Sequence, residues 1–144
     1  MPGDAQYYFL LVRATNAVRR ATDAAATAAA GITAAQAGAL YAIAAGDPPS
    51  QRELGRTLGL GEAAVTGLVG RLERMGLARR TPDPADGRTW RLAVTDDGRR
   101  ALDAIEPVRR ELNGRLAGLL GDDAPRVAAA LERLAALDVA PPAR

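Results

Sequence analysis

Arginine is the residue of this sequence with the most obvious chemistry. All 19 basic residues are arginines, because the chain contains no lysine and no histidine. A guanidinium group binds phosphate through paired, charge-assisted hydrogen bonds, so a cluster of arginines favours an anionic partner. Residues 71–91 form such a cluster, with six arginines and three acids. This basic segment suits a nucleic acid, although ordinary solvation of a protein surface explains a modest patch equally well.

The missing residue types exclude most catalytic and sensing chemistry. A chain without cysteine has no disulfide, iron–sulfur cluster or thiol nucleophile. The absence of histidine and lysine removes the commonest general base, the commonest metal ligand, Schiff-base chemistry and a P-loop. Paired carboxylates such as Asp122 and Asp123 resemble the acidic start of a helix more than an active site. We therefore expect a binding protein that is not an enzyme and holds no metal or cofactor.

Length and composition favour one helical domain with an extension. A chain of 144 residues has the size of a single domain. Its 33 alanines and its aromatic content of 3% favour closely packed helices over a β-sandwich. The longest uncharged stretch, residues 24–46, is too weakly apolar for a bilayer span, and the N-terminus lacks a signal-peptide pattern. We expect a cytoplasmic protein that makes no membrane contact.

Helix capping signals and glycines divide the first half of the chain. Propensity and apolar spacing predict helices over about residues 4–30, 33–45, 50–58 and 62–75. Thr33 and Ser50 each begin a capping box, since Gln36 and Glu53 follow three residues later. Gly31 suits the residue that ends the first helix.

In the second half of the chain, the spacing of apolar residues changes from that of a helix to that of a β-strand. Residues 77–81 and 89–94 are strand candidates around a turn-rich segment, in which Asp86-Gly87 is a strong hairpin signal. A long helix then starts at Thr95 and contains Pro107, which predicts a local distortion. The expected buried side of this helix consists of Leu102, Ile105, Leu112, Leu116 and Leu119. A last helix follows Asp123, and the tail over residues 141–144 is expected to fray.

The order of these elements predicts a mainly α fold with a small β-hairpin wing, in which long helices flank a winged helix-turn-helix. A helix of the length of residues 62–75 fits the major groove of DNA, and the preceding short helix braces it across the backbone. A basic hairpin can reach the adjacent minor groove or the phosphates.

At this point the sequence resembles the MarR family of bacterial transcription regulators. The resemblance covers nearly the whole chain, and the order and spacing of its motifs are more specific than any one motif. The matching segments are residues 50–54, 58–60, 65–66, 68–69, 71–77, 79–88 and 92–95, followed by Gly98 and Leu102.

The resemblance implies a homodimer joined through the terminal helices. The implied organisation is a dimerisation helix over residues 1–31, a DNA-binding domain over 32–100 and dimerisation helices over 101–144. The implied interface residues are Tyr8, Leu11, Leu116, Leu119, Val127, Leu131 and Leu134. Packing within one subunit is the alternative for these side chains. Two-fold symmetry predicts a pseudo-palindromic operator with half-sites about one helical turn apart.

The resemblance also implies a set of DNA-binding residues. Arg88 is expected to enter the minor groove and Asp86 to orient the wing through a charge pair. Arg79, Arg80 and Arg91 are either phosphate contacts or solvated surface. The complete expected set is Ser50, Gln51, Glu62, Ala63, Ala64, Thr66, Gly67, Arg71, Arg79, Arg80, Asp86 and Arg88. The exposed half of the helix over 62–75 lacks the arginine and asparagine that read bases, so specificity depends on the wing and on DNA shape.

Family members often bind small aromatic effectors, and ligand binding usually releases DNA. The implied pocket residues are the aromatic side chains Tyr7, Tyr8, Phe9, Tyr41 and Trp90, for which ordinary packing is the alternative. The absence of cysteine and histidine excludes thiol-based oxidant sensing and imidazole-based metal sensing. We expect a transcriptional repressor that binds double-stranded DNA and that dissociates from the DNA when a small aromatic or phenolic ligand binds. The second hypothesis is a dimeric winged-helix adaptor for protein interaction with weakened DNA readout.

Overall fold

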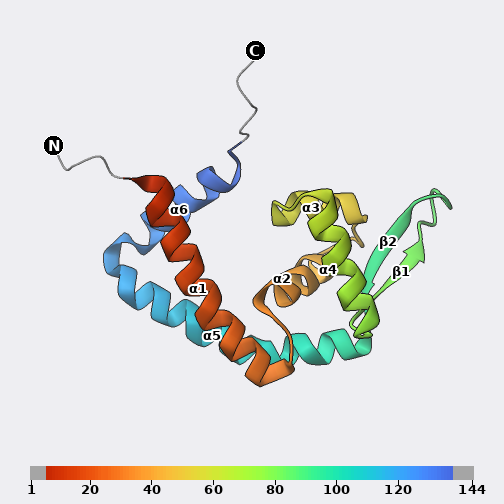
Figure 1. Ribbon diagram of the computed structural model, residues 1–144, viewed down its shortest axis with the longest axis horizontal. Coiled ribbons are helices and arrows are strands. Elements are labelled where there is room, and N and C mark those ends of the chain that lie inside the picture. The colour runs from red at the N-terminus through yellow and green to blue at the C-terminus, as the bar shows by residue number, and fades with distance from the viewer. Residues whose placement is uncertain (1–5, 138–144) are drawn as a thin grey trace, which may run out of the picture. The chain divides into compact units, whose positions relative to one another are not determined.

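The computed structural model describes residues 6–137 of the chain (Figure 1). Its elements are α1 (Tyr7–Ala30), α2 (Ala34–Ala44), α3 (Gln51–Leu58), α4 (Glu62–Arg74), β1 (Ala78–Pro82), β2 (Trp90–Val94), α5 (Asp96–Leu120), the 3₁₀ turn η1 (Gly121–Asp123) and α6 (Ala124–Ala135). The expected mainly helical class with one hairpin is confirmed. The expected helix start near Asp4 and the expected frayed tail over 141–144 lie outside the described residues.

The chain divides into two compact units within α5. The N-terminal unit extends to Arg109, and the C-terminal unit begins at Arg110. Within residues 6–137, no single helix has the length and apolar character of a membrane span. Only α1 and α2 taken together meet that criterion, and they are bent by 74° at the break between them.

Both predicted capping boxes form and determine where two helices begin. The Thr33 hydroxyl accepts from the backbone N–H of Gln36, and the Gln36 side chain accepts from the backbone N–H of Thr33. Ser50 and Glu53 make the same reciprocal pair at the start of α3. Gly31 and Gly59 end α1 and α3 with φ of 66° and 64°, a left-handed conformation that favours glycine. These caps satisfy backbone groups that have no partner within a helix.

The core of the N-terminal unit holds α3 and α4 together as a helix-turn-helix. Leu54 on α3 and Leu72 on α4 are fully buried with Leu40 of α2 and Leu92 of β2. The two helices approach closely at Gly55, where an added Cβ would stand 3.5 Å from a methyl group of Val65 on α4. The remaining face of α4 is therefore free to meet a ligand.

The two strands form an antiparallel wing in which Ala78 pairs with Val94 and Pro82 with Trp90. Its base is attached to the segment before α3, since the N–H of Leu92 donates to the carbonyl oxygen of Pro49 at 2.8 Å. The predicted hairpin around the turn-rich segment is confirmed. The loop spans residues 83–89, and Gly87 within it does not adopt the positive φ of a two-residue hairpin turn. Asp83 extends the hairpin instead, because its N–H donates to the carbonyl oxygen of Thr89.

The C-terminal unit buries few of its own apolar side chains. Helix α5 continues through Pro107 without interruption, and α6 has no buried residue among those described. Ile105, on the part of α5 that belongs to the N-terminal unit, is buried as expected. The expected burial of Leu119 is wrong within one chain, because 84% of this residue is exposed. Leu131 and Leu134 on α6 are also exposed.

Candidate nucleic-acid interface

A groove lies between α3 and the start of α4. It has a volume of about 690 Å³ and is lined by Gln51, Arg52, Gly55, Arg56, Gly59, Leu60, Glu62 and Val65. Arg52 and Arg56 are exposed one turn apart on α3, and the described part of the chain offers neither of them a hydrogen-bond or ion-pair partner. They are therefore available to bind phosphate. The DNA-binding set expected from the sequence lacks both, although their i, i+4 spacing opposite the inward Leu54 and Leu58 could have indicated them.

The outer face of α4 consists mainly of small side chains, as the sequence indicated. Glu62, Ala63, Ala64 and Thr66 are exposed, and Gly67 is half-buried. The Arg71 and Arg74 side chains lie back along the helix, since a Cβ on Gly67 would be 3.8 Å from Arg71 Nη1 and one on Gly70 would be 3.4 Å from Arg74 Nη1. The small residues thus let two guanidinium groups lie along a helix face that carries few other polar groups.

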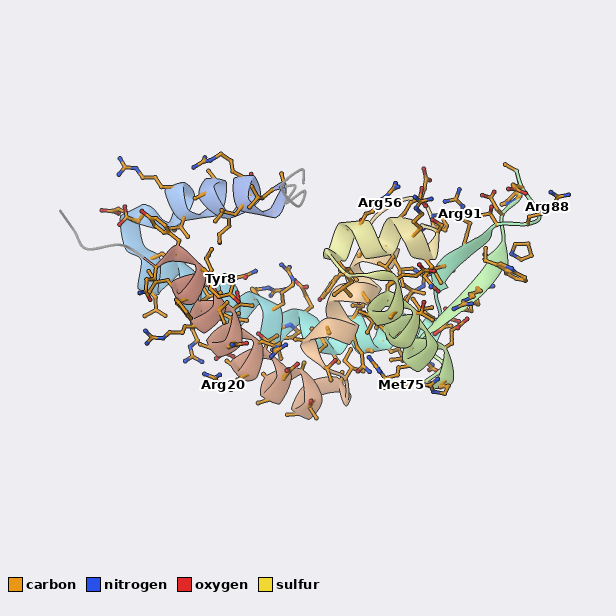
Figure 2. The ribbon with its side chains drawn as sticks, turned by 45° about the horizontal axis from the view of Figure 1, so that its top comes forward. Tyr8, Arg20, Arg56, Met75, Arg88 and Arg91 are labelled. Carbon is orange, nitrogen blue, oxygen red and sulfur yellow. The ribbon has the colours of Figure 1, made fainter. Side chains whose placement is uncertain are left out.

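The arginines of the wing belong to two classes that the sequence did not distinguish. Arg79 and Arg88 are exposed and have no side-chain partner within residues 6–137. Arg80 and Arg91 instead bind residues of the helix-turn-helix. Figure 2 shows Arg88 at the tip of the wing and Arg91 between the wing and α3. Two of the four wing arginines are therefore free to contact phosphate, and the other two have partners within the protein.

Arg91 connects the wing to the N-terminus of α3. Its Nε donates to Asp83 Oδ2 and its Nη1 donates to Glu53 Oε2, both at 2.7 Å. The pKa of Glu53 is lowered, mainly by the backbone N–H of Ser50 and further by Arg91. The pKa of Asp83 is also lowered, first by the backbone N–H of Ala85 and then by Arg91. Both carboxylates remain charged at neutral pH, so the link is intact there.

Arg80 makes a second connection, to both helices of the helix-turn-helix. Its Nη2 donates to Gln51 Oε1 at 3.0 Å, and its Nε lies 3.3 Å from Glu73 Oε1. Gln51 in turn donates from Nε2 to the hydroxyl of Thr66 at 2.7 Å. The expected DNA-binding residues Gln51, Thr66 and Arg80 are therefore brought together, but as a network that joins α3, α4 and β1. Ser50 lies beside this network as the cap of α3.

Asp86 organises the tip of the wing through hydrogen bonds. Its Oδ1 accepts from the backbone N–H of Arg88 at 3.0 Å, and its Oδ2 accepts from the hydroxyl of Thr89 at 2.9 Å. The expected charge pair of Asp86 does not form among the described residues, where the side chain of Arg88 is exposed and has no partner. The turn that results presents Arg88 at the outermost point of the hairpin (Figure 2).

The five aromatic residues do not gather in one place. Tyr7, Tyr8 and Phe9 occupy the first turn of α1, where Tyr8 and Phe9 meet edge to face at 5.4 Å. Tyr41 on α2 packs against the core and donates a hydrogen bond to Glu106 Oε2 at 3.2 Å. Burial, and then this hydrogen bond, raise the pKa of the Tyr41 phenol. Trp90 stands apart from all of them on the wing.

Comparison with known proteins places this arrangement in a family. Residues 30–89, which include the helix-turn-helix and most of the wing, match the MarR family. The transcriptional repressor NicR of Pseudomonas putida is 33% identical over 82 residues, which are 57% of this chain and 52% of that protein. The match therefore spans about half the length of NicR.

Two solved structures extend the likeness to the flanking helices. CouR of Rhodococcus jostii, bound to p-coumaroyl-CoA, is 27% identical with a TM-score of 0.81, covering 95% of this chain and 96% of CouR. The transcriptional repressor CouR bound to a 23-mer DNA duplex is 30% identical with a TM-score of 0.74, covering 90% of this chain and 91% of that one. The chain belongs to the MarR family of transcriptional regulators, which are not enzymes.

Proposed function

We propose that this chain is a cytoplasmic, homodimeric repressor that binds a pseudo-palindromic DNA operator. The observation that carries this proposal is the set of exposed, partnerless arginines on the winged unit. Arg52 and Arg56 lie on α3, and Arg88 lies at the wing tip, so both parts of the unit offer cations to one DNA duplex. The DNA-bound relative CouR and the repressor NicR support the same function.

The wing and the helix-turn-helix have different tasks in this proposal. Helix α4 enters the major groove with Glu62, Ala63, Ala64, Thr66, Gly67 and Arg71, which offer few hydrogen bonds to base edges. Arg88 enters the minor groove, where a narrow groove concentrates negative potential and attracts a guanidinium group. Arg79 contacts the phosphates beside it. Sequence preference then depends mainly on groove width and DNA flexibility.

We expect the affinity for random-sequence duplex DNA to fall steeply with salt, because arginines displace counterions from the phosphates. Arg88→Ala should weaken binding and reduce the slope of log K against log salt by about one unit. The measurement is fluorescence anisotropy of a labelled duplex over a salt series.

Arg20→Ala is the matched control, since Arg20 is an exposed arginine on α1, away from the wing (Figure 2). This variant should retain the parent affinity and slope. No binding of the parent chain at low salt would contradict the repressor and favour the dimeric protein-interaction adaptor. An unchanged slope in Arg88→Ala would remove Arg88 from the interface.

The homodimer is proposed from apolar surface that one chain does not cover. The first six residues of α1 are all apolar or aromatic and exposed, with Tyr8 72% exposed. On helix α6, Leu131 and Leu134 are exposed and Val127 is half-buried. On α5, Leu119 is exposed and Leu116 is half-buried. Apolar surface of this extent indicates a protein interface. We assign residues 1–31 and 101–144 to dimerisation and residues 32–100 to DNA binding.

Leu131→Asp is expected to convert the dimer to monomer, because it places a carboxylate in the apolar surface of α6. The control is Ala129→Asp, which adds the same charge to an exposed position on the other side of α6. Light scattering after size-exclusion chromatography measures the mass of each variant. A folded dimer of Leu131→Asp would show that the interface lies elsewhere.

The regulatory ligand is proposed to be a small aromatic acid or its thioester. The support is the relative CouR, which binds p-coumaroyl-CoA, and the group of Tyr7, Tyr8 and Phe9 at the start of α1. Tyr41 adds a phenol close to the core. The anisotropy experiment repeated with p-coumaroyl-CoA tests this ligand class, and release of DNA at micromolar ligand is the expected result. An unchanged affinity would exclude that ligand.

A further inference from the structure

Trp90 is a large exposed apolar residue that the proposed dimer leaves unexplained. The tryptophan is 54% exposed. The other large hydrophobic residues of the described chain that are at least as exposed lie on α1, near the end of α5 or just after α6, in the segments assigned to dimerisation. Trp90 instead opens β2 on the wing, two residues after Arg88.

The strand register determines which way Trp90 faces. Trp90 pairs with Pro82, which is also exposed, and Leu92 pairs with Arg80. Residues that face each other across a two-stranded sheet project from the same side, and so do residues two apart along a strand. Trp90 and Pro82 therefore share the side of the hairpin on which Leu92 enters the core and Arg80 reaches Gln51 and Glu73.

This side of the wing is turned towards α3 and α4. Its inner part is covered by the protein core, whereas Trp90 and Pro82 lie beyond the edge of that core and remain exposed. A duplex with α4 in its major groove and Arg88 in the adjacent minor groove has one sugar–phosphate strand between the two. That strand must pass along the side of the wing that carries Trp90 and Pro82.

We propose that Trp90, supported by Pro82, makes an apolar contact with the deoxyribose groups of that strand. The proposal rests on the DNA-binding function above and adds a contact that is not electrostatic. The indole offers a large, rigid apolar surface, and the sugar carbons offer the matching one. The free arginine nearest in sequence, Arg88, supplies a phosphate contact beside this pair. The contact depends on groove width, so it contributes to readout of DNA shape.

The chain has a single tryptophan, so its fluorescence reports this contact directly. Titration of the full chain with a random-sequence duplex, excited where tyrosine does not absorb, should change the intensity of the tryptophan emission and shift it to shorter wavelength. Anisotropy of a labelled duplex, measured in parallel, reports binding without the tryptophan. Binding with unchanged tryptophan emission would overturn this inference and leave the proposed function standing. No binding in the anisotropy arm would overturn both.

Two substitutions separate an apolar contact from a charged one. Trp90→Ala should weaken DNA binding about 5- to 30-fold with an unchanged salt slope, because no phosphate contact is lost. Trp90→Phe should retain most of the affinity, which also shows that the wing folds. Arg88→Ala is the contrasting variant, because its slope should fall. Parent-like affinity of Trp90→Ala contradicts the contact, and so does a tryptophan signal that responds to p-coumaroyl-CoA but not to DNA.

Discussion

Gly98→Ala is expected to destabilise the N-terminal unit strongly, although it adds only one methyl group. A Cβ at Gly98 would overlap the carbonyl oxygen of Leu77 and would stand 2.6 Å from a methyl group of Val94. The first of these atoms belongs to the backbone, so no side-chain rotation relieves the overlap. The expected loss in the free energy of unfolding is roughly 2–4 kcal/mol.

The start of α5 cannot move away from this contact without losing hydrogen bonds. The N–H of Thr95 donates to the carbonyl oxygen of Leu77 at 3.1 Å, and the Thr95 hydroxyl donates to the carbonyl oxygen of Gly76 at 2.6 Å. The N–H of Gly98 donates to the same hydroxyl at 3.0 Å. A shift of α5 that accommodates the methyl group therefore breaks the link between the end of α4, the wing and α5.

Gly38→Ala is the matched control for this prediction. Gly38 lies within α2, and an added Cβ there meets no heavy atom within 4 Å. Helix propensity alone then predicts a gain of roughly 0.5–1 kcal/mol. Urea denaturation at one fixed protein concentration compares the two variants, because a dimer's stability depends on concentration. Equal stability of the two variants would show that Leu77 does not pack on α5 at this point.

The elements of this fold could be predicted because their signals are local. The Thr33 and Ser50 caps each depend on a partner three residues away, and both boxes form. The apolar spacing of Val65, Leu68 and Leu72 predicts the inner face of α4, and all three are buried. Signals within one turn of a helix do not depend on the rest of the chain, so composition and spacing suffice for them.

The roles of individual arginines could not be predicted, since they depend on distant partners. Arg79 and Arg80 are neighbours in the sequence, yet only Arg80 is bound to Gln51, which lies 29 residues away. Arg91 finds Glu53 across 38 residues. The loop of the wing shows the same limit. The sequence located the turn-rich segment but not the hydrogen bond from the N–H of Asp83 to the carbonyl oxygen of Thr89, which extends the hairpin beyond its two strands.

Arg91→Ala is expected to weaken DNA binding about fivefold to tenfold without changing its salt slope. Arg91 has Glu53 and Asp83 as partners, so its removal takes away no phosphate contact. It releases the wing loop from α3, and the loop must then be ordered when DNA binds. Arg91→Lys should not restore affinity, because an ammonium group lacks the planar fork that serves two carboxylates at once.

Arg79→Ala provides the contrast, because Arg79 projects from the same side of the hairpin as Arg91 but its side chain has no partner among the described residues. Its loss should lower the salt slope by about one unit, as expected for a phosphate contact. Hydrogen exchange of the backbone N–H groups of Asp83 and Thr89 should accelerate in Arg91→Ala and not in Arg79→Ala. A lower salt slope in Arg91→Ala would assign Arg91 to the phosphates and contradict its role in positioning the wing.

The pH dependence follows from the direction of the two pKa shifts. The ordinary pKa values of Glu53 and Asp83 are 4.5 and 3.8, and both are lowered in the folded chain. A lowered pKa gives stabilisation that is complete above the ordinary value and is lost as the pH falls through the folded one. The chain contains no histidine, so no side chain with an ordinary pKa titrates between about pH 5.5 and 8. The ratio of parent to Arg91→Ala affinity should therefore be constant over that range and decrease only in more acidic solution. A ratio that varies near neutrality would mean that the link between Arg91 and the two carboxylates does not control the wing.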